Sequence, residues 1–535
     1  MASKNWTNRY FDFFPPVFLP SAILIVLFIS TTLIVGDPME AIFNRLQNGI
    51  VDNHGWLLVL AVNVFMVVCL LFAFSKFGSI RIGGNEARPE FSTFAWFSML
   101  FSAGMGIGLL FFSVGEPITH FAAPPVPFTD QAERANNAFT YTFLHWGLHA
   151  WAIYALIGLG LAFMAFNRKQ PLTIRSLFYP LFGDRIHGPI GNIIDVIAVV
   201  ATLFGLATSL GFGVQQVAAG LDHLFQIPNT VNTQVILIGL ITLAATASVV
   251  AGLDKGVRVL SELNLRLGLI FLVLMLIIGP TVFLLDGYIQ NTGRYFQELI
   301  GLGTWTETYT GGKWQNDWSV FYWAWWISWS PFVGMFIARV SKGRTIREFI
   351  LGVLLVPTLL TFLWMSVFGG SAIFLELQVP GAISVAVNEE LSTALFVLLE
   401  QFPMNFVTSL LGIVLVTSFF VTSSDSGSLV IDSITAGGKL DAPVGQRIFW
   451  ALSEGGVAAT LLLGGGLAAL QTAATITGLP FALLLLVMVY SLYLGLKEEY
   501  EEDQRKRQSR EHASYEKILK DLVQKQEKTE ERGTN

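Results

Sequence analysis

The sequence predicts an all-α membrane protein with 12 transmembrane helices, and three observations support this. Of its 535 residues, 53% are hydrophobic and only 13% are charged, whereas soluble domains carry about 25% charged residues. Apolar runs near or above ~18 residues, the length of a membrane-spanning helix, recur along the whole chain. Basic residues are concentrated in alternate loops between these runs, as in membrane proteins with a fixed orientation.

Each apolar run sets one predicted span. The spans cover residues 17–36, 56–74, 91–112, 141–166, 190–212, 233–252, 263–285, 317–339, 348–375, 404–424, 446–463 and 475–496. The first is a full-length span with no small-residue cleavage site before it, so we expect no cleaved signal peptide. The single cysteine, Cys69, lies within the second span, which leaves disulfides and thiolate metal sites unsupported.

The distribution of Lys and Arg predicts the orientation of the spans. With the N-terminus inside, the cytoplasmic loops hold Lys76, Arg81, Arg88, Arg168, Lys169, Arg175, Arg185, Lys255, Arg258, Arg266, Arg339, Lys342, Arg344, Arg347, Lys439 and Arg447. The outer loops then hold only Arg45, Arg134, Arg294 and Lys313. Because this excess follows the positive-inside rule, we expect both termini to be cytoplasmic.

The spans divide into two blocks of five, residues 91–285 and 317–496, preceded by two peripheral spans within residues 17–90. The first span of each block contains residues that do not suit a plain lipid-facing helix: three glycines in one and Pro331 with the tryptophans in the other. An odd number of spans per block gives the blocks opposite orientations. Interrupted helices at corresponding positions of two halves indicate a substrate site near the midplane.

Three shorter segments complete the predicted organisation. Residues 1–16 form a cytoplasmic N-terminus, and residues 286–316 form an outer segment. Within that segment, 286–301 is either an amphipathic helix in the interface or an ordered loop. Residues 497–535 form a highly charged cytoplasmic tail, which we expect to be solvated and partly helical.

Four of the 14 tryptophans lie within seven residues, in the run Trp323-Ala-Trp-Trp-Ile-Ser-Trp329. Aromatic belts flank a span at the membrane interface, but these tryptophans lie inside one. Their π-faces attract organic cations in a low-dielectric site, and quaternary ammonium groups are well-known ligands of such rings. A second aromatic group is formed by Trp151 and Tyr154, which share a helix face, and by Trp146 about a turn earlier.

Two polar motifs lie inside spans and suggest ligand contacts. The glycines of Gly104-Met-Gly-Ile-Gly108 each lower helix propensity by about 1 kcal/mol relative to Ala. Their spacing wraps around a helix, so it favours unwinding over close helix packing, and unwound backbone must be buried or line a cavity. In Phe419-Phe-Val-Thr-Ser-Ser-Asp-Ser-Gly-Ser428, Thr422 and Ser423 offer oxygen ligands to a small cation, or the helix simply ends in water there.

Other motifs exclude classes of function. His145 and His149 have the i, i+4 spacing of a metal pair, but no further ligands accompany them at a recognisable spacing. We therefore expect them to hydrogen-bond to neighbouring helices. The sequence contains no P-loop, no nucleophile elbow and no HExxH motif, so we expect neither an enzyme nor a nucleic-acid partner. Energy must therefore come from an ion gradient, or the protein is passive.

Together these residues resemble the betaine/choline/carnitine transporter family. The resemblance is carried by Gly104–Gly108 followed by Glu116-Pro117, by the tryptophan motif leading to Arg339 and Gly343-Arg344, and by the segments 171–175 and 254–264. It extends from about residue 15 to residue 496. It implies the inverted five-helix repeat of the leucine-transporter type, with two extra N-terminal helices, and commonly a homotrimer. It also implies a carrier for trimethylammonium-type solutes in a bacterial inner membrane.

The resemblance also implies site residues. By this resemblance, the aromatic box would consist of Trp146, Trp151, Tyr154 and Trp326, and Trp325 and Trp329 would line the same pathway. Met105, Gly106 and Gly108 would lie near the substrate carboxylate. The same resemblance implies a sodium site formed by the carbonyls of Ser102, Met105 and Phe419 and the hydroxyls of Thr422 and Ser423. Sodium is here the co-transported ion, and no cofactor is expected.

Three departures from the family pattern bear on coupling and regulation. Proton-coupled choline carriers of the family have an acidic residue where this chain has Gly108, which favours sodium coupling. A second sodium site would use two threonines, but this chain has Thr202 and Leu206, and leucine offers no oxygen. The short tail also differs from the long basic tail of osmosensing members. We therefore expect a sodium symporter for glycine betaine, with choline, carnitine, ectoine, dimethylsulfoniopropionate, proton coupling and ion-independent exchange as alternatives.

Overall fold

The computed structural model describes residues 5–104, 106–251, 257–439, 441 and 443–533, and nearly all of them are helical. The long helices are α1 (Pro15–Val35), α2 (Pro38–Phe74), α3 (Thr93–Gly104), α4 (Ile107–Ala122), α5 (Gln131–Trp146), α6 (Leu148–Phe166), α8 (Pro189–Phe225), α9 (Val231–Ala251), α10 (Val257–Ile278), α11 (Thr281–Gly303), α12 (Val320–Val340), α13 (Ile346–Gln378), α16 (Asn405–Thr435) and α17 (Val444–Gly533). Short helices are α7 (Tyr179–Phe182), α14 (Ser384–Glu389) and α15 (Ala394–Glu400). One hairpin pairs β1 (Trp6–Thr7) with β2 (Asp12–Phe13).

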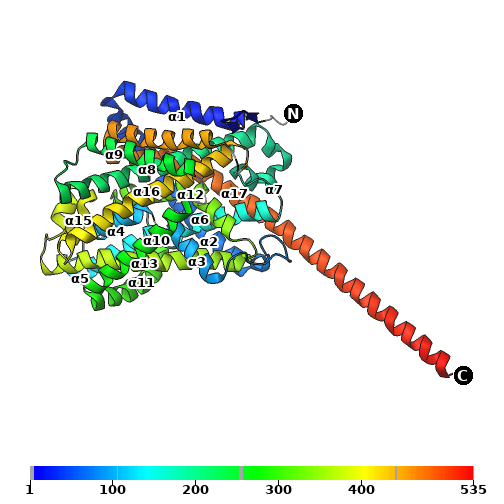
Figure 1. Cartoon of the computed structure of the whole chain (residues 1–535). Coiled ribbons are helices and arrows are strands. Elements are labelled where there is room, and N and C mark those ends of the chain that lie inside the picture. Colours follow the sequence, from blue (N-terminus) through cyan, green and yellow to red (C-terminus); the bar gives the residue numbers. More distant parts are fainter. Residues whose placement is uncertain (1–4, 105, 252–256, 440, 442, 534–535) are drawn as a thin grey trace.

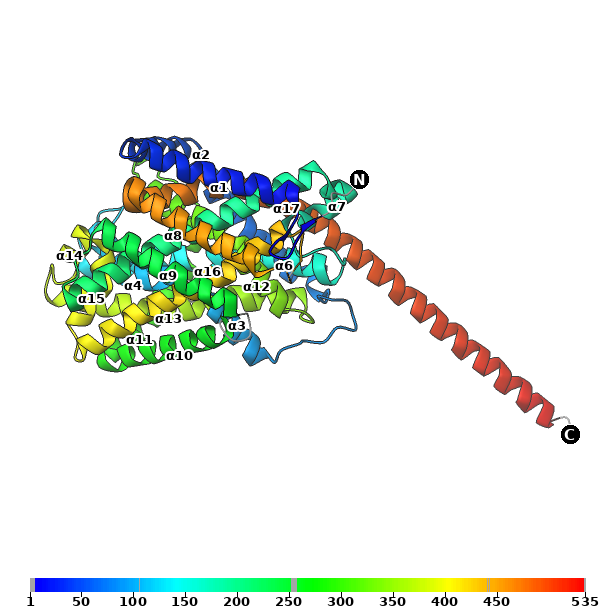
Figure 2. The ribbon, with the colours of Figure 1, turned by 45° about the horizontal axis from the view of Figure 1, so that its top comes forward.

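Most helices of the body run side by side, and both ends of the chain lie at the same end of the molecule (Figure 1). Within the described residues, nine helices are long and apolar enough to cross a membrane, with α5 and α6 counted as one. The short α3–α4 pair and α12 are outside that count. In the second view, α1 and α2 lie along one flank of the body and α10 and α11 along the opposite flank (Figure 2).

Helix α17 contains two helices joined at a kink. Gly465 and Gly466 have φ values of 156° and 59°, which a residue with a Cβ rarely adopts. The chain therefore bends between the segments predicted as the last two spans. Beyond the body the helix continues without a break through the predicted tail, which projects away from the body (Figure 1). The tail is thus helical throughout residues 497–533, and not only partly helical as predicted.

Several predicted boundaries differ from the structure. The second predicted span, residues 56–74, is the C-terminal half of α2, which begins at Pro38, where a proline suits the first turn of a helix. The seventh predicted span, residues 263–285, corresponds to α10, which already ends at Ile278. The next helix, α11, begins at Thr281 and includes all of residues 286–301. That segment is therefore a helix, and the alternative of an ordered loop is wrong.

The predicted interruption at Gly104–Gly108 is confirmed, because α3 ends at Gly104 and α4 begins at Ile107. The interruption predicted at Pro331 is wrong, because α12 continues through this residue. Proline lacks the N–H that would bond to the carbonyl four residues earlier, here that of Ile327. The hydroxyl of Ser330 donates to this carbonyl at 2.5 Å, so the carbonyl keeps a donor and the helix continues.

Helix α16 also differs from the prediction for its hydroxyl-rich segment. The helix continues to Thr435 and does not end in water near residue 424. Ser424, Asp425 and Ser428 are buried between helices, and Ser424 and Asp425 bond to Glu454 and Ser248 respectively. Neighbouring helices, and not solvent, therefore satisfy these polar groups.

Candidate functional site

The predicted aromatic residues meet around one cavity. Trp146, Ala150, Trp151, Tyr154, Trp326, Trp329 and Thr361 line a cavity with an empty volume of about 370 Å³. The ring centroids of Trp146 and Trp326 are 5.0 Å apart and nearly perpendicular. Tyr154 lies 5.9 Å from Trp326 and 5.6 Å from Trp151, again edge to face. Five of the six predicted aromatic side chains therefore line one cavity, and four of them form a box in which neighbouring rings meet edge to face.

A helix break that the sequence analysis missed shapes this box. Helix α5 ends at Trp146 and α6 begins at Leu148, with Gly147 between them. A Cβ on Gly147 would lie 2.5 Å from the carbonyl oxygen of Phe143 and 2.6 Å from the hydroxyl of Tyr295. That hydroxyl accepts the backbone N–H of Leu148 at 2.9 Å. Trp146 and Trp151 therefore lie on two short helices, and a glycine inside an apolar run was the available signal.

Three of the four tryptophans of α12 are held by a hydrogen bond from the indole N–H. Trp326 donates to the backbone carbonyl of His145 at 2.9 Å, and Trp329 donates to the carbonyl of Gly205 at 2.9 Å. Trp325 donates to the hydroxyl of Ser209 at 3.1 Å. Trp325 is stacked behind Trp326, with ring centroids 5.0 Å apart, and does not line the cavity. It supports the box from behind.

Gly108 lets α4 approach these rings closely. A Cβ there would lie 2.3 Å from Trp325 and 3.2 Å from Trp146, so even an alanine would displace a ring. Gly106, which precedes α4, has extended backbone with φ of −157°. Met105 was also predicted to contact substrate and sodium, but it lies outside the described residues. Residues 254–256 of the family-like segment 254–264 also lie outside the described residues.

A second cavity contains the predicted sodium ligands. Its empty volume is about 600 Å³. Its walls are formed by Ser102 of α3, Ser261 and Asn264 of α10, Trp329, Phe332, Val333 and Phe336 of α12, and Phe419, Thr422, Ser423 and Ser426 of α16. All four predicted ligands that the structure describes therefore face one space. Trp329 lines both cavities and separates them, with the second cavity on the side of Arg339.

The hydroxyl of Thr422 is at the centre of the polar part of this cavity. It donates toward the carbonyls of Ser418 and Phe419, at 3.0 and 3.1 Å, and accepts from the Asn264 amide at 3.1 Å. The amide oxygen of Asn264 is buried and has no hydrogen-bond partner among the described residues. Oxygen ligands of this kind, hydroxyl and carbonyl, suit a small hard cation.

The structure also reveals a buried carboxylate that the sequence analysis did not assign to the site. Glu116 of α4 lies behind the aromatic box and is fully buried. It accepts hydrogen bonds from His145 at 2.6 Å, from the Trp146 indole at 2.8 Å and from the Tyr322 hydroxyl. Because its partners are 29, 30 and 206 residues away, only the Glu-Pro motif could have drawn attention to it.

The two histidines of the predicted metal-like pair bond to different helices. His145 contacts Glu116 and the hydroxyl of Ser319, at 2.6 and 2.8 Å, whereas His149 contacts Asn63 of α2 at 3.1 Å. The prediction that they hydrogen-bond to neighbouring helices is thus confirmed. A different trio, Glu116, His120 and His145, has ligand atoms within 4.8 Å of one another.

This geometry can be compared with known proteins. The family described as "BCCT, betaine/carnitine/choline family transporter" matches residues 16–501 of the chain. The chain belongs to this family. It is therefore a multi-pass membrane transporter and not an enzyme, as predicted.

Curated relatives cover nearly the whole chain. A glycine betaine/proline/choline transporter of Vibrio parahaemolyticus is 49% identical over 502 residues, which are 90% of this chain and 90% of that protein. A glycine betaine/proline/choline/ectoine transporter of the same organism is 47% identical, over 91% of this chain and 88% of that protein. The glycine betaine transporter OpuD of Bacillus subtilis is 44% identical, over 87% and 91%.

Proposed function

We propose that this protein is a secondary active symporter that imports glycine betaine together with sodium across a bacterial inner membrane. The observation that carries the proposal is the box of crossed rings around one buried cavity. A trimethylammonium group in such a box gains cation–π attraction of about 2 kcal/mol or more where it is desolvated. The names of the relatives support a betaine-type substrate.

The second cavity supports the sodium part of the proposal. Thr422, Ser423, Ser102 and the backbone of Phe419 would supply the oxygen ligands on α3 and α16. A sodium ion between these helices would favour closure around the substrate only when both ligands are bound. Leu206 supports a single sodium ion, because it packs against Gly427, where a Cβ would lie 2.3 Å from its side chain. Apolar contact therefore occupies the space between α8 and α16.

The fold supports the finer topology. The nine apolar helices give 12 spans when the two arms of α17 are counted separately and when the α3–α4 pair and α12 are each added as one span. We propose that these form two inverted repeats of five helices, in residues 91–285 and 317–496, after two peripheral spans. The homotrimer implied by the family resemblance stays a prediction.

The proposal is tested by uptake of labelled glycine betaine into proteoliposomes, with and without an inward sodium gradient. We expect sodium-dependent uptake that excess choline inhibits only weakly. Thr422→Val keeps the shape of the side chain but removes a sodium ligand, so it should lower the apparent sodium affinity by about tenfold or more. Sodium-free exchange, or proton-driven choline uptake, would contradict the proposal.

A matched control is available for Thr422→Val. Thr460 of α17 also donates its hydroxyl to the carbonyl four residues earlier, that of Gly456, at 2.7 Å, but it lines neither cavity. Thr460→Val should therefore leave the sodium dependence unchanged. Equal effects of the two substitutions would mean that Thr422 acts on helix structure and not on sodium.

A further inference from the structure

We propose that Glu116 is a positioning residue for the aromatic box, and that its buried carboxylate orients Trp146 directly and Trp326 through His145. This inference rests on the proposed function, because it adds a residue to the same onium site. Glu116 lines neither cavity described above, so it acts through the aromatic side chains and not by contact with the substrate.

The first step is the number of donors around the carboxylate. One oxygen accepts from His145 at 2.6 Å and from His120 at 3.4 Å. The other oxygen accepts from the Trp146 indole at 2.8 Å and from the Tyr322 hydroxyl. A buried carboxylate is costly unless it is hydrogen-bonded, and hydrogen bonds to a charged acceptor are stronger than neutral ones. The arrangement therefore fixes each donor more firmly than a neutral acceptor would.

The second step is that these bonds leave no ligand atom for a metal ion. The Trp314 indole can only donate, and it donates to Nδ1 of His120 at 3.2 Å. Nε2 of His120 must then carry the proton that it shares with Glu116. Both ring nitrogens of His145 are also occupied, by Glu116 and by Ser319. The trio of Glu116, His120 and His145 is therefore a satisfied hydrogen-bond network.

The third step connects the network to Trp326. Because both nitrogens of the His145 ring are bonded, the side chain of this residue is fixed relative to α4 and to Ser319. The backbone carbonyl of the same residue accepts the indole N–H of Trp326 at 2.9 Å. The dipeptide His145-Trp146 thus supplies one ring of the box and the anchor of another, and Glu116 bonds to both of its side chains.

The fourth step explains why such an anchor is needed. His145 and Trp146 are the last residues of α5, and the chain breaks at Gly147 before α6 begins. The last residues of a helix have carbonyls without an intrahelical partner, and helix ends fray more easily than helix interiors. Cation–π attraction requires that the cation meets the face of a ring and not its edge. A fixed acceptor on a neighbouring helix can supply the missing restraint.

A double-mutant cycle tests this role. In Glu116→Gln the new amide has two donors of its own facing the four surrounding donors, so the network cannot be satisfied. We expect the KM for glycine betaine uptake to rise about tenfold or more, with a smaller change in kcat. In a Trp146→Phe background, which already lacks the indole bond, Glu116→Gln should add no more than about twofold, because coupled residues are not additive.

A spectroscopic measurement shows, without any substrate, whether Glu116 orients Trp146. Near-ultraviolet circular dichroism reports rigidly held indoles, and Trp146→Phe defines the signal of Trp146 in the substrate-free protein. We expect Glu116→Gln to remove at least half of that signal. If wild-type protein fails to bind glycine betaine, the proposed function is wrong, while the dichroism still decides whether Glu116 orients Trp146.

The control is Glu376→Gln. Glu376 of α13 is another buried glutamate with several donors, the backbone N–H groups of Gly381, Ile383 and Ser384, but it lines neither cavity. Glu376→Gln should therefore leave the KM for glycine betaine unchanged. If Glu116→Gln protein cannot be purified, the same cycle is run with Glu116→Asp, which retains the charge but is one methylene shorter. The proposal would be overturned if KM in the double mutant rose by the product of the two single-mutant effects. It would also be overturned if the Trp146 dichroism signal were unchanged in the Glu116 variant.

Discussion

Trp326 is the residue on which the two halves of the proposed substrate site depend. It belongs to α12, and its ring lies edge to face with Trp146 of α5 and Tyr154 of α6. Its back is covered by Trp325 and its N–H is bonded to His145. Because this ring contacts the box residues contributed by both helices, it should carry a large share of onium recognition.

We therefore expect Trp326→Leu to abolish tight binding of glycine betaine and to leave folding largely intact. Leucine fills part of the space but has no π-face, so cation–π attraction of about 2 kcal/mol or more is lost, roughly a 30-fold change in affinity. Binding is measured by titration of detergent-purified protein, with thermal stability measured in parallel. Trp56→Leu is the control, because Trp56 is 57% exposed on α2. Unchanged affinity in Trp326→Leu would contradict the box assignment.

At the residue scale, the sequence indicated the aromatic box but not its support. Tryptophans inside a span are rare enough that their clustering predicted a cation site. The family resemblance implied the six individual rings, and five of them line one cavity. Glu116 could not be placed in the same way, because three of its four donors are distant in the sequence and their directions depend on tertiary packing. The position of Trp325 behind Trp326 depends on packing for the same reason.

At the scale of elements, predictions from apolar runs succeeded where hydrophobicity alone decides and failed where a single side chain repairs a break. The glycines at 104–108 predicted the gap between α3 and α4. Pro331 predicted a second gap, but the hydroxyl of Ser330 keeps α12 continuous. Conversely, the only local signal for the break at Gly147 was a glycine inside an apolar run, and the approach of Tyr295 to this glycine depends on tertiary packing.

The N-terminal hairpin is an element whose attachment should depend on pH. Lys439 donates to Asp12 at 2.6 Å, and Asn5 and Thr7 donate to the same carboxylate at 3.0 Å each. Partial burial opposes ionisation, but these hydrogen bonds outweigh it and hold the pKa of Asp12 below its ordinary value of 3.8. The ionised form is therefore stabilised in the folded state, and this stabilisation is complete at neutral pH.

As the pH falls below 3.8 and through the lowered pKa of Asp12, the hairpin should lose this contribution and detach from the end of α16. Hydrogen exchange at residues 5–14 should be slow at neutral pH and faster in this acid range, after correction for intrinsic rates. Asp12→Asn should show the faster exchange at neutral pH already. Asp37→Asn serves as a control, because Asp37 makes no side-chain capping bond at the start of α2. Equal exchange in Asp12→Asn and wild type would refute the role of Asp12.

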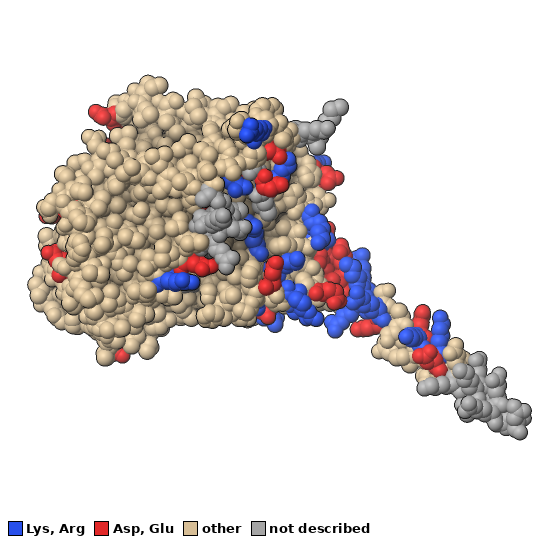
Figure 3. Space-filling model, in the orientation of Figure 1, with Lys and Arg blue, Asp and Glu red and all other residues tan. Residues whose placement is uncertain are grey.

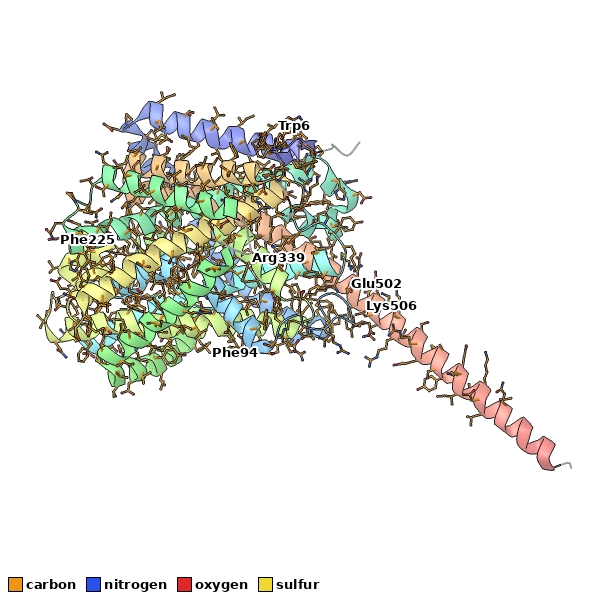
Figure 4. All side chains as sticks on the ribbon, viewed as in Figure 1. Trp6, Phe94, Phe225, Arg339, Glu502 and Lys506 are labelled. Atoms are coloured by element: carbon orange, nitrogen blue, oxygen red, sulfur yellow. The ribbon has the colours of Figure 1, made fainter. Side chains whose placement is uncertain are left out.

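At the scale of the whole molecule, charge is distributed very unevenly. Lys and Arg gather at the end of the body from which the tail projects, and the opposite end shows almost none on the face in view (Figure 3). Glu502 and Lys506 mark the start of the tail beyond that end, while Phe225 lies at the far end of the body (Figure 4). The tail is attached there by Arg168, which pairs with Glu498, Glu499 and Glu502. The positive-inside rule predicts that this end is cytoplasmic.

Labelling of introduced cysteines tests this orientation. The only native cysteine, Cys69, is buried, so the background should be low. Thr308, in the loop between α11 and α12, and Ser509, in the tail, are both exposed. A membrane-impermeant maleimide should modify Thr308→Cys in intact spheroplasts, and Ser509→Cys only after the membrane is permeabilised. The reverse pattern would place the basic end outside. Labelling of both sites without permeabilisation would mean that the two ends of the body are not on opposite sides of the membrane. The expected pattern would place the cavity on the Arg339 side of Trp329 toward the cytoplasm, as the proposed import requires.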